Sequence, residues 1–169
     1  MRVLFLAFFL FGAAAQALSP GDSLPSDLAA KNQNGKLVSL ASFHGQFVVV
    51  YFYPKDDTPG CTLEAQNFQA DLNNFKNLNA VILGVSRQDE ASHQKFIAKH
   101  SLKFDLLVDS DGKFSQAFGV GSIPVLGLTK RQSALIGPDG KLVRFYDSVN
   151  PKDHAKEVLK DIEKAKVKS

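Results

Sequence analysis

The chain has 169 residues, of which 44% are hydrophobic and 22% charged, and its formal net charge at pH 7 is +3. This composition is typical of one globular domain that is long enough to bury its own core without metal or disulfide staples. The small net charge argues against nucleic acid or an acidic membrane surface as a partner.

The first 17 residues have the pattern of an export signal. A positive Arg2 precedes an almost wholly apolar run, and residues 15–17 (AQA) fit a small-x-small cleavage site. A buried N-terminal helix or a membrane anchor is the alternative, but the run is short and a polar stretch with Pro and Gly follows it. We therefore expect a signal peptide over residues 1–17 and an exported, periplasmic or secreted domain over residues 18–169, with no membrane span in the mature form.

The mature chain begins with strand-like patterns. A hairpin is predicted over residues 28–40, because Asn34-Gly35 is a strong short-range turn signal. Residues 46–53 (QFVVVYFY) form an unbroken apolar run, which is typical of a strand buried on both faces of its sheet. A helix is predicted from Cys61 to Asn77. Its expected buried face comprises Leu63, Phe68, Leu72 and Phe75.

The second half of the chain continues to alternate strands and helices, which predicts an α/β fold with crossover connections. The strands are predicted over residues 80–86, 104–108, 133–136 and 142–146. The helices are predicted over residues 89–100 and 113–118, with Gly119 as a C-cap, and from Asn150-Pro151 onward. The inward residues of the two longer helices are expected to be Ala91, Phe96, Ile97, Ala155, Val158, Leu159 and Ile162.

The one cysteine of the chain, Cys61, lies in the segment 51–62 (YFYPKDDTPGCT). Exported proteins usually hold cysteines in disulfide pairs, so a lone thiol is either buried by accident or kept for its reactivity. Cys61 follows the carboxyl end of a predicted buried strand, where α/β sheets place ligand sites. It also opens a helix, whose N-terminal partial positive charge favours a thiolate over a thiol.

Thiolate attack on a peroxide breaks the O–O bond and builds negative charge on the departing oxygen, so fixed hydrogen-bond donors lower the barrier. The candidate donors are the Thr58 hydroxyl, the backbone N–H of Cys61 and a guanidinium, which stays charged and offers forked donors.

These residues carry a family resemblance. Pro54, Thr58 and Cys61 match the P-x-x-x-T-x-x-C motif of peroxiredoxins, and YPKDDTPGCT-x-EA resembles their bacterioferritin-comigratory-protein, or Q-type, branch. The resemblance extends over about residues 21–162. Its further stretches are GVS at 84–86, KF at 95–96, LLVDSDG at 106–112, FGV at 118–120, and Arg131 ahead of ALIGPDGKL.

The resemblance implies a thioredoxin-like fold, with a central mixed sheet flanked by helices and an N-terminal β-hairpin extension. It implies Cys61 as the peroxidatic nucleophile, Thr58 as the residue that orients the peroxide, and Pro54 as a shield against water. Arg131 would stabilise the thiolate and the peroxide oxygens. The implied activity is thiol-dependent reduction of hydrogen peroxide and organic hydroperoxides, with no cofactor.

The chain departs from this branch at one position. Many members carry a second, resolving cysteine five residues after the first, where this chain has Gln66. The sulfenic acid of Cys61 would then need an external thiol of thioredoxin, glutaredoxin or low-molecular-weight type, or the Cys61 of a second copy. We expect a monomer or a weak homodimer.

Each site residue also has a simpler interpretation. Cys61 could be a small buried hydrophobe, Thr58 a helix N-cap, and Pro54 a strand terminator. Arg131 could be a surface residue, and Arg87 is the rival guanidinium, in a segment expected to be a surface loop.

Glutamate and histidine residues elsewhere in the chain are expected to have structural or solvated roles. Glu64, in the first turn of the Cys61 helix, either pairs with an arginine or only favours the helix dipole, and the second interpretation is slightly favoured. His93 and His100 are expected on the solvated side of their helix. His44 and His154 have no partner at metal-ligand spacing, so no metal site is predicted.

Two other functions share parts of this pattern. A dithiol oxidoreductase of the same fold requires C-x-x-C, and a copper-delivery protein also needs a second thiol, but residue 58 is a threonine. An exported binding or holdase module without turnover is the remaining alternative, because the chain lacks a resolving cysteine.

Overall fold

The computed structural model describes residues 18–25 and 27–168, and the expected signal peptide over residues 1–17 lies outside them. The strands are β1 (Ala29–Asn32), β2 (Leu37–Ser39), β3 (Phe47–Phe52), β4 (Ala80–Ser86), β5 (Asp105–Val108), β6 (Ser122–Ile123), β7 (Leu128–Thr129), β8 (Gln132–Ile136) and β9 (Leu142–Tyr146). The helices are α1 (Pro59–Ala70), α2 (Leu72–Asn77), α3 (Glu90–His100), α4 (Lys113–Ala117) and α5 (His154–Lys168), with a 3-10 helix η1 (Leu40–Phe43).

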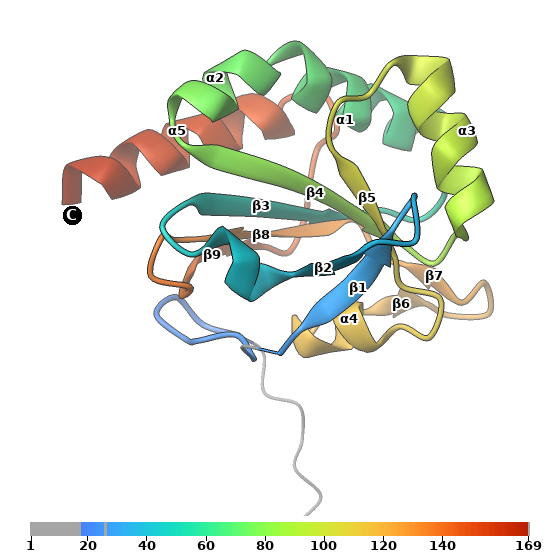
Figure 1. The fold of residues 1–169 in the computed structure, drawn as a ribbon, viewed down its shortest axis with the longest axis horizontal. Helices are drawn as coiled ribbons and strands as arrows, with labels where there is room; N and C mark the ends of the chain where they lie inside the picture. The colour runs from blue at the N-terminus through green and yellow to red at the C-terminus, as the bar shows by residue number, and fades with distance from the viewer. Residues whose placement is uncertain (1–17, 26, 169) are drawn as a thin grey trace, which may run out of the picture.

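Among the described residues, seven strands form one mixed sheet in the order β2-β1-β5-β4-β3-β8-β9 (Figure 1). β3, β4 and β5 are parallel, and the other neighbouring pairs are antiparallel. The predicted N-terminal hairpin is the β1–β2 pair, and Gly35 in its turn has a φ of 73°, which glycine adopts without strain. The expected α/β, thioredoxin-like fold is therefore confirmed.

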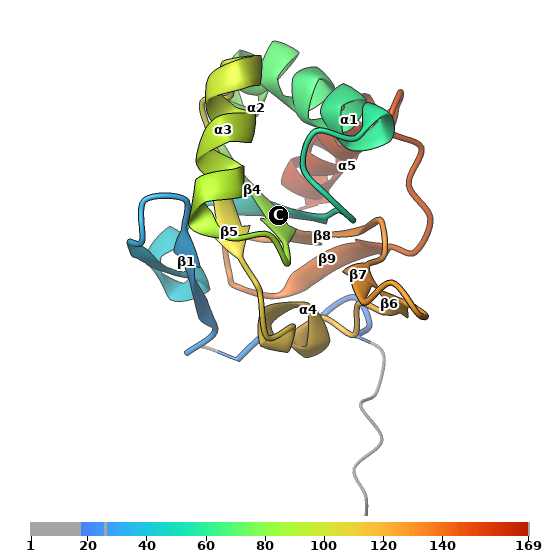
Figure 2. The same cartoon turned by 90° about the vertical axis from the view of Figure 1, so that its right-hand side faces the viewer.

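The helices cover the two faces of the sheet unequally. α1, α2, α3 and α5 lie on one face, and the short α4 lies on the other (Figures 1 and 2). Each face has its own apolar core. Phe68, Phe75 and Val158 belong to the core of the first face, and Phe114 and Phe118 belong to that of the second.

β3 lies between these two cores, which explains its unbroken apolar sequence. Successive side chains of a strand point to opposite faces, so Tyr51 and Tyr53 enter the core under α1 while Val50 and Phe52 enter the other core. All four side chains are fully buried. The strand predicted over residues 46–53 is thus confirmed, and its carboxyl end leads directly into the segment that carries the motif.

The helix predicted over residues 61–77 is in fact two helices that meet at Asp71, whose backbone (φ −92°, ψ 7°) leaves α-helical geometry. Phe68 and Phe75 are buried as predicted, but Leu63 is 42% exposed. Leu63 precedes Phe68 by five residues, a spacing that places two side chains on different sides of a helix. The predicted apolar face was therefore wrong at its first member.

α3 also differs from the prediction at two positions, Ala91 and His93. It begins after Asp89, whose carboxylate accepts a hydrogen bond from the Ser92 backbone N–H at 2.8 Å. Phe96 is buried as predicted, but Ala91 is exposed and His93 is fully buried. His93 precedes Phe96 by three residues and therefore lies on the same face of the helix.

The last helix begins later than predicted. α5 starts at His154, and Asn150 instead accepts a hydrogen bond from the Lys152 backbone N–H at 3.1 Å in the turn before the helix. Ala155, Val158 and Ile162 are buried, as expected for its apolar face. No helix in the described part of the chain is both long and apolar enough to cross a membrane.

Candidate active site

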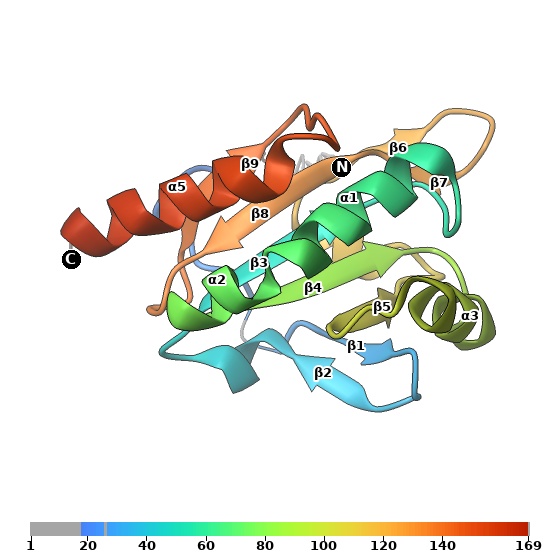
Figure 3. The same cartoon turned by 90° about the horizontal axis from the view of Figure 1, so that it is seen from above.

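Three parts of the chain converge at one end of the sheet, beyond the carboxyl end of β3. The segment 54–60 leaves the carboxyl end of β3 and leads into α1, which lies over the sheet in the view from above (Figure 3). Pro54 and Thr58 belong to this segment, and Cys61 lies in the first turn of α1. Arg131 lies in the short link between β7 and β8. The fold therefore brings Arg131 to the start of the helix that carries Cys61.

The Cys61 sulfur is buried but has a cationic partner. Cys61 is 1% exposed, and Nη2 of Arg131 donates a hydrogen bond to its Sγ at 3.2 Å. The side chain of Arg131 is itself 19% exposed, so the cationic partner of the buried sulfur is partly accessible to solvent. A hydrogen-bonded cation favours the thiolate form of a sulfur. The rival Arg87 lies against Gly112 instead.

Arg131 also pairs with a buried carboxyl group. Its Nη1 forms an ion pair with Oε2 of Glu64, whose side chain is 1% exposed. Pairing with an arginine, the less favoured of the two interpretations of Glu64, is therefore the one that the structure shows. Burial raises the pKa of Glu64 to about 7, although the charge and the hydrogen bond of Arg131 act in the opposite direction. The ion pair holds the guanidinium so that its second amino group faces the sulfur.

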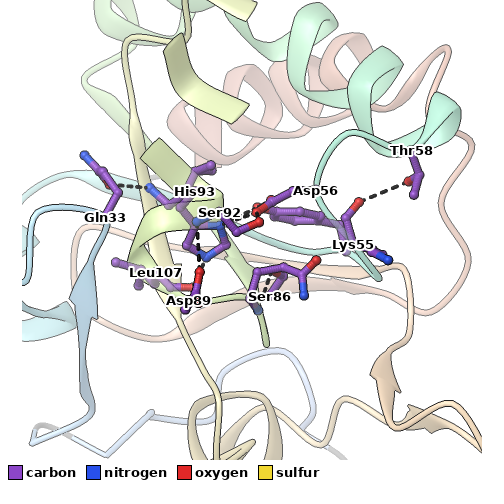
Figure 4. Close-up of polar contacts among 12 residues, drawn as sticks. Gln33, Lys55, Asp56, Thr58, Ser86, Asp89, Ser92, His93 and Leu107 are labelled. Atoms are coloured by element: carbon purple, nitrogen blue, oxygen red, sulfur yellow. Dashed lines mark hydrogen bonds and ion pairs between the residues drawn. The ribbon is translucent and has the colours of Figure 1, made fainter. Parts of the chain in front are cut away.

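The Thr58 hydroxyl is oriented by the backbone of its own segment. Oγ1 donates a hydrogen bond to the Lys55 carbonyl oxygen at 3.0 Å (Figure 4). Thr58 occupies the N-cap position of α1, but its side chain makes no capping hydrogen bond. Because its proton is already engaged, Oγ1 offers lone pairs to a ligand, rather than the donor expected from the sequence.

Gly60 is a residue that the sequence reasoning did not single out, although the Pro-Gly pair before Cys61 was the available signal. A Cβ at Gly60 would lie 3.2 Å from Nη2 of Arg131, so glycine lets the guanidinium approach the sulfur closely. Pro54 is half-buried directly after Tyr53. That position is compatible with shielding the site from water and with ending the strand, so the role of Pro54 stays a prediction.

The histidines of α3 were predicted wrongly. Nδ1 of His93 lies 2.9 Å from Asp56, and Nε2 of His100, whose side chain is 11% exposed, lies 2.9 Å from Asp57. Both histidines were expected to be solvated. Instead each pairs with an aspartate of the segment 54–60, which faces α3. His154 is also buried, and burial lowers its pKa to about 4. Within residues 18–25 and 27–168, no three His, Cys, Asp or Glu side chains are grouped to hold a metal ion.

One thiol beside one guanidinium, at the start of a helix in a thioredoxin-like fold, defines a class of protein. Dithiol exchange within the chain requires two thiols, and the chain has one cysteine. A nucleophilic sulfur next to a fixed donor for a departing oxygen has instead the arrangement of a thiol peroxidase.

Comparison with known sequences agrees with this class. The AhpC/TSA family pattern matches residues 20–145. Peroxiredoxin Bcp of Bacillus subtilis is 40% identical over 142 residues, which cover 80% of this chain and 90% of that protein. Peroxiredoxin Q of Triticum aestivum, a chloroplastic protein, is 39% identical over 142 residues, which cover 83% of this chain and 65% of that longer protein.

Solved structures lead to the same group. PrxQ of Xylella fastidiosa matches with a TM-score of 0.82 and 32% identity, covering 89% of this chain and 99% of that one. The bacterioferritin comigratory protein of Xanthomonas campestris, studied for alkyl peroxide reduction, matches with a TM-score of 0.79 and 35% identity, covering 85% and 99%. The chain therefore belongs to the AhpC/TSA family, and its relatives are Bcp/PrxQ peroxiredoxins. It is a thiol-dependent peroxidase.

Proposed function

We propose that Cys61 is the peroxidatic nucleophile of this enzyme and that Arg131 stabilises first the thiolate and then the departing oxygen. The observation that carries this proposal is the 3.2 Å hydrogen bond from Nη2 of Arg131 to the Cys61 sulfur. A guanidinium stays charged throughout the working pH range and offers several donors in one plane. It can therefore bind the sulfur and a peroxide oxygen together.

In the proposed reaction, the Cys61 thiolate attacks the terminal oxygen of a hydroperoxide. A S–O bond forms as the O–O bond breaks, and the sulfur becomes a sulfenic acid after a two-electron oxidation. The departing alkoxide or hydroxide takes a proton from solvent and leaves as an alcohol or as water. Fixed donors are most effective at the oxygen where charge develops during this step.

Thr58 and Pro54 complete the proposed site. The Thr58 hydroxyl proton is bound to the Lys55 carbonyl, which leaves the oxygen to accept a hydrogen bond from the terminal O–H of the hydroperoxide. That contact would orient the oxygen for attack. Pro54, at the carboxyl end of β3, would limit the access of water to the same space.

An external thiol is proposed to resolve the sulfenic acid. Cys61 is the only cysteine of the chain, and Gln66, five residues later, is exposed and contacts His100 at 3.3 Å. A thiol of thioredoxin, glutaredoxin or low-molecular-weight type would attack the sulfenic acid, form a mixed disulfide and release water. A second thiol would then release the disulfide product and restore Cys61.

The test is stoichiometric oxidation of the mature protein by one equivalent of hydrogen peroxide. The wild-type protein is expected to lose its thiol, and Cys61→Ser is expected to consume no peroxide. Peroxide reduction that survives in Cys61→Ser would refute the mechanism. With dithiothreitol present, the wild-type protein should consume excess peroxide continuously, whereas a binding module without turnover would not.

We also propose export of the mature domain. The support is the charged, apolar and small-residue pattern of residues 1–17 in the sequence. N-terminal sequencing of protein recovered from the periplasm or the medium should begin at Leu18. Recovery of the intact chain from the cytosol alone would contradict this proposal.

A further inference from the structure

A buried polar cluster fastens the segment 54–60 to α3 (Figure 4). At its centre is the carboxylate of Asp56, which is 7% exposed. Its Oδ1 accepts a hydrogen bond from the Tyr53 hydroxyl at 2.7 Å, and its Oδ2 accepts one from the Ser92 hydroxyl at 2.6 Å. Nδ1 of His93, which is fully buried, lies 2.9 Å from the same Oδ2. Three groups therefore converge on one carboxylate in the interior.

The His93 ring faces an acceptor on each side. Nδ1 faces the carboxylate, and Nε2 lies 3.2 Å from the Leu107 carbonyl oxygen, which can only accept. With Asp56 ionised, both nitrogens of His93 donate and Asp56 and His93 form a buried ion pair. Burial raises the pKa of Asp56, but the hydrogen bond and the charge of His93 outweigh it, and the pKa lies below its usual value. Removing one partner of such a pair leaves the other buried and uncompensated.

The peptide group between Lys55 and Asp56 connects this cluster to the Thr58 hydroxyl. The Lys55 carbonyl that accepts the Thr58 hydroxyl proton belongs to the peptide that joins Lys55 to Asp56. A peptide group is planar, so holding Asp56 in place restricts the direction in which this carbonyl points. The carbonyl in turn determines where the lone pairs of the Thr58 oxygen point.

We propose that Asp56 is a positioning residue for the peroxide step, because the cluster orients the Lys55 carbonyl and, through it, the Thr58 hydroxyl. Asp56 itself touches neither the sulfur nor the peroxide. The inference rests on the proposed function of Cys61 and Thr58, and it adds an interior element that this function requires.

Asp57 provides a matched control on the same segment. Its carboxylate also pairs with α3, through Lys99 at 2.5 Å and His100 at 2.9 Å. Its side chain is 44% exposed, however, and exposed ion pairs contribute little to stability. Asp57 has a φ of 58°, in the left-handed region that asparagine tolerates. Asp57→Asn therefore removes the same charge with little strain.

The experiment compares Asp56→Asn, Ser92→Ala and Asp57→Asn in single-turnover oxidation of Cys61 by hydrogen peroxide. Asp56→Asn should lower the rate constant by about 10-fold or more, Ser92→Ala by a smaller factor, and Asp57→Asn by less than about twofold. Alkylation of the thiol by iodoacetamide, which needs no Thr58 hydroxyl, should change by less than about twofold in all three. In a Thr58→Val background, Asp56→Asn should have almost no further effect, because both changes act on one hydroxyl.

Three results would overturn the inference. They are a wild-type oxidation rate in Asp56→Asn, a loss that multiplies with that of Thr58→Val, and a parallel loss of iodoacetamide reactivity. If Asp56→Asn does not fold, Ser92→Ala in the same cycle decides, because it removes one hydroxyl from a half-buried position. If the wild-type protein does not lose its thiol to peroxide, the proposed function fails instead, so the two failures are distinguishable.

Discussion

Among single residues, Arg131 has two partners that use its charge in different ways. Its pairing with Glu64 is buried and holds the guanidinium in place, whereas its contact with the Cys61 sulfur is made by the other amino group. Planar, forked donors allow one side chain to do both, and an ammonium on a flexible stem does not. Arginine and lysine are therefore not equivalent at this position.

Arg131→Met should slow oxidation of Cys61 by about 100-fold to 1,000-fold, because it removes one fixed donor to developing negative charge. Stopped-flow measurement of thiol loss tests this. Arg144→Met is the control, since Arg144 pairs with Glu157 and Asp161 and is expected to leave the rate unchanged. An unaltered rate in Arg131→Met would mean that another cation serves the sulfur.

Glu64→Gln should change the pH dependence of folding stability. The pKa of Glu64 is about 7 in the folded chain against an ordinary 4.5, so the folded state binds its proton more tightly. The stability that this group contributes is present below pH 4.5 and is lost as pH rises through 7. Urea unfolding should show the variant gaining up to about 3 kcal/mol relative to wild type between pH 4.5 and pH 8. A pH-independent difference would contradict the raised pKa.

At the scale of whole elements, β4 packs so closely that one of its positions has no room for a side chain. A Cβ at Gly84 would lie 2.5 Å from Cδ2 of Leu106 and 2.8 Å from the Tyr51 ring. These neighbours belong to the core under α1, where β3 and β5 flank β4. Interiors packed at this density do not absorb an added methyl group freely.

Gly84→Ala should therefore lower the free energy of unfolding by about 1–3 kcal/mol through overpacking. Denaturant unfolding of the purified domain measures this loss. Gly60→Ala is the matched comparison, because its nearest neighbour is the end of a flexible arginine at 3.2 Å. Gly60→Ala should affect the oxidation rate more than stability. Equal stability losses in the two variants would contradict this account.

The elements of the fold could be predicted because their signals are local. The apolar run of β3 and the Asn34-Gly35 turn each reflect the residues of that stretch alone. The pairing of His93 with Asp56 could not be predicted, because it joins a loop to a helix 37 positions away. A histidine among charged residues of a helix carries no sign of its partner, and its burial depends on a carboxylate that the pattern of α3 does not contain.

Contacts between residues distant in the sequence were also unpredictable at the active site. Motif spacing could predict that Cys61 and Thr58 lie at the start of one helix, since both belong to one continuous segment. The pairing of Glu64 with Arg131 spans 67 positions and depends on how α1 packs against the β7–β8 link. The direction of the Thr58 hydroxyl depends on a backbone carbonyl, which residue types do not reveal.

On the scale of the whole molecule, the burial of Cys61 restricts how two copies can react with each other. A disulfide requires Cβ atoms about 3.5–4.5 Å apart. A sulfur that is buried in the first turn of α1, in a residue 1% exposed, cannot approach a second such sulfur without opening both folds. A Cys61-linked dimer is therefore disfavoured, and a small external thiol is a more accessible partner.

After one equivalent of peroxide, intact-mass measurement should show a monomer that has gained one oxygen. Non-reducing electrophoresis should show no dimer band. A doubled mass that a reducing agent reverses would contradict this expectation and would show that α1 opens readily. Cys61→Ser, treated in parallel, identifies any oxygen gained elsewhere on the chain.

Because the chain has a single sulfhydryl, its oxidation state can be measured directly on the unmodified protein. Every molecule contains one cysteine, so the sulfhydryl content of the denatured protein equals the fraction of reduced active centres. A thiol-specific mass tag applied to quenched cell fractions would report that fraction in a living culture. No substitution of background cysteines would be needed for the assay.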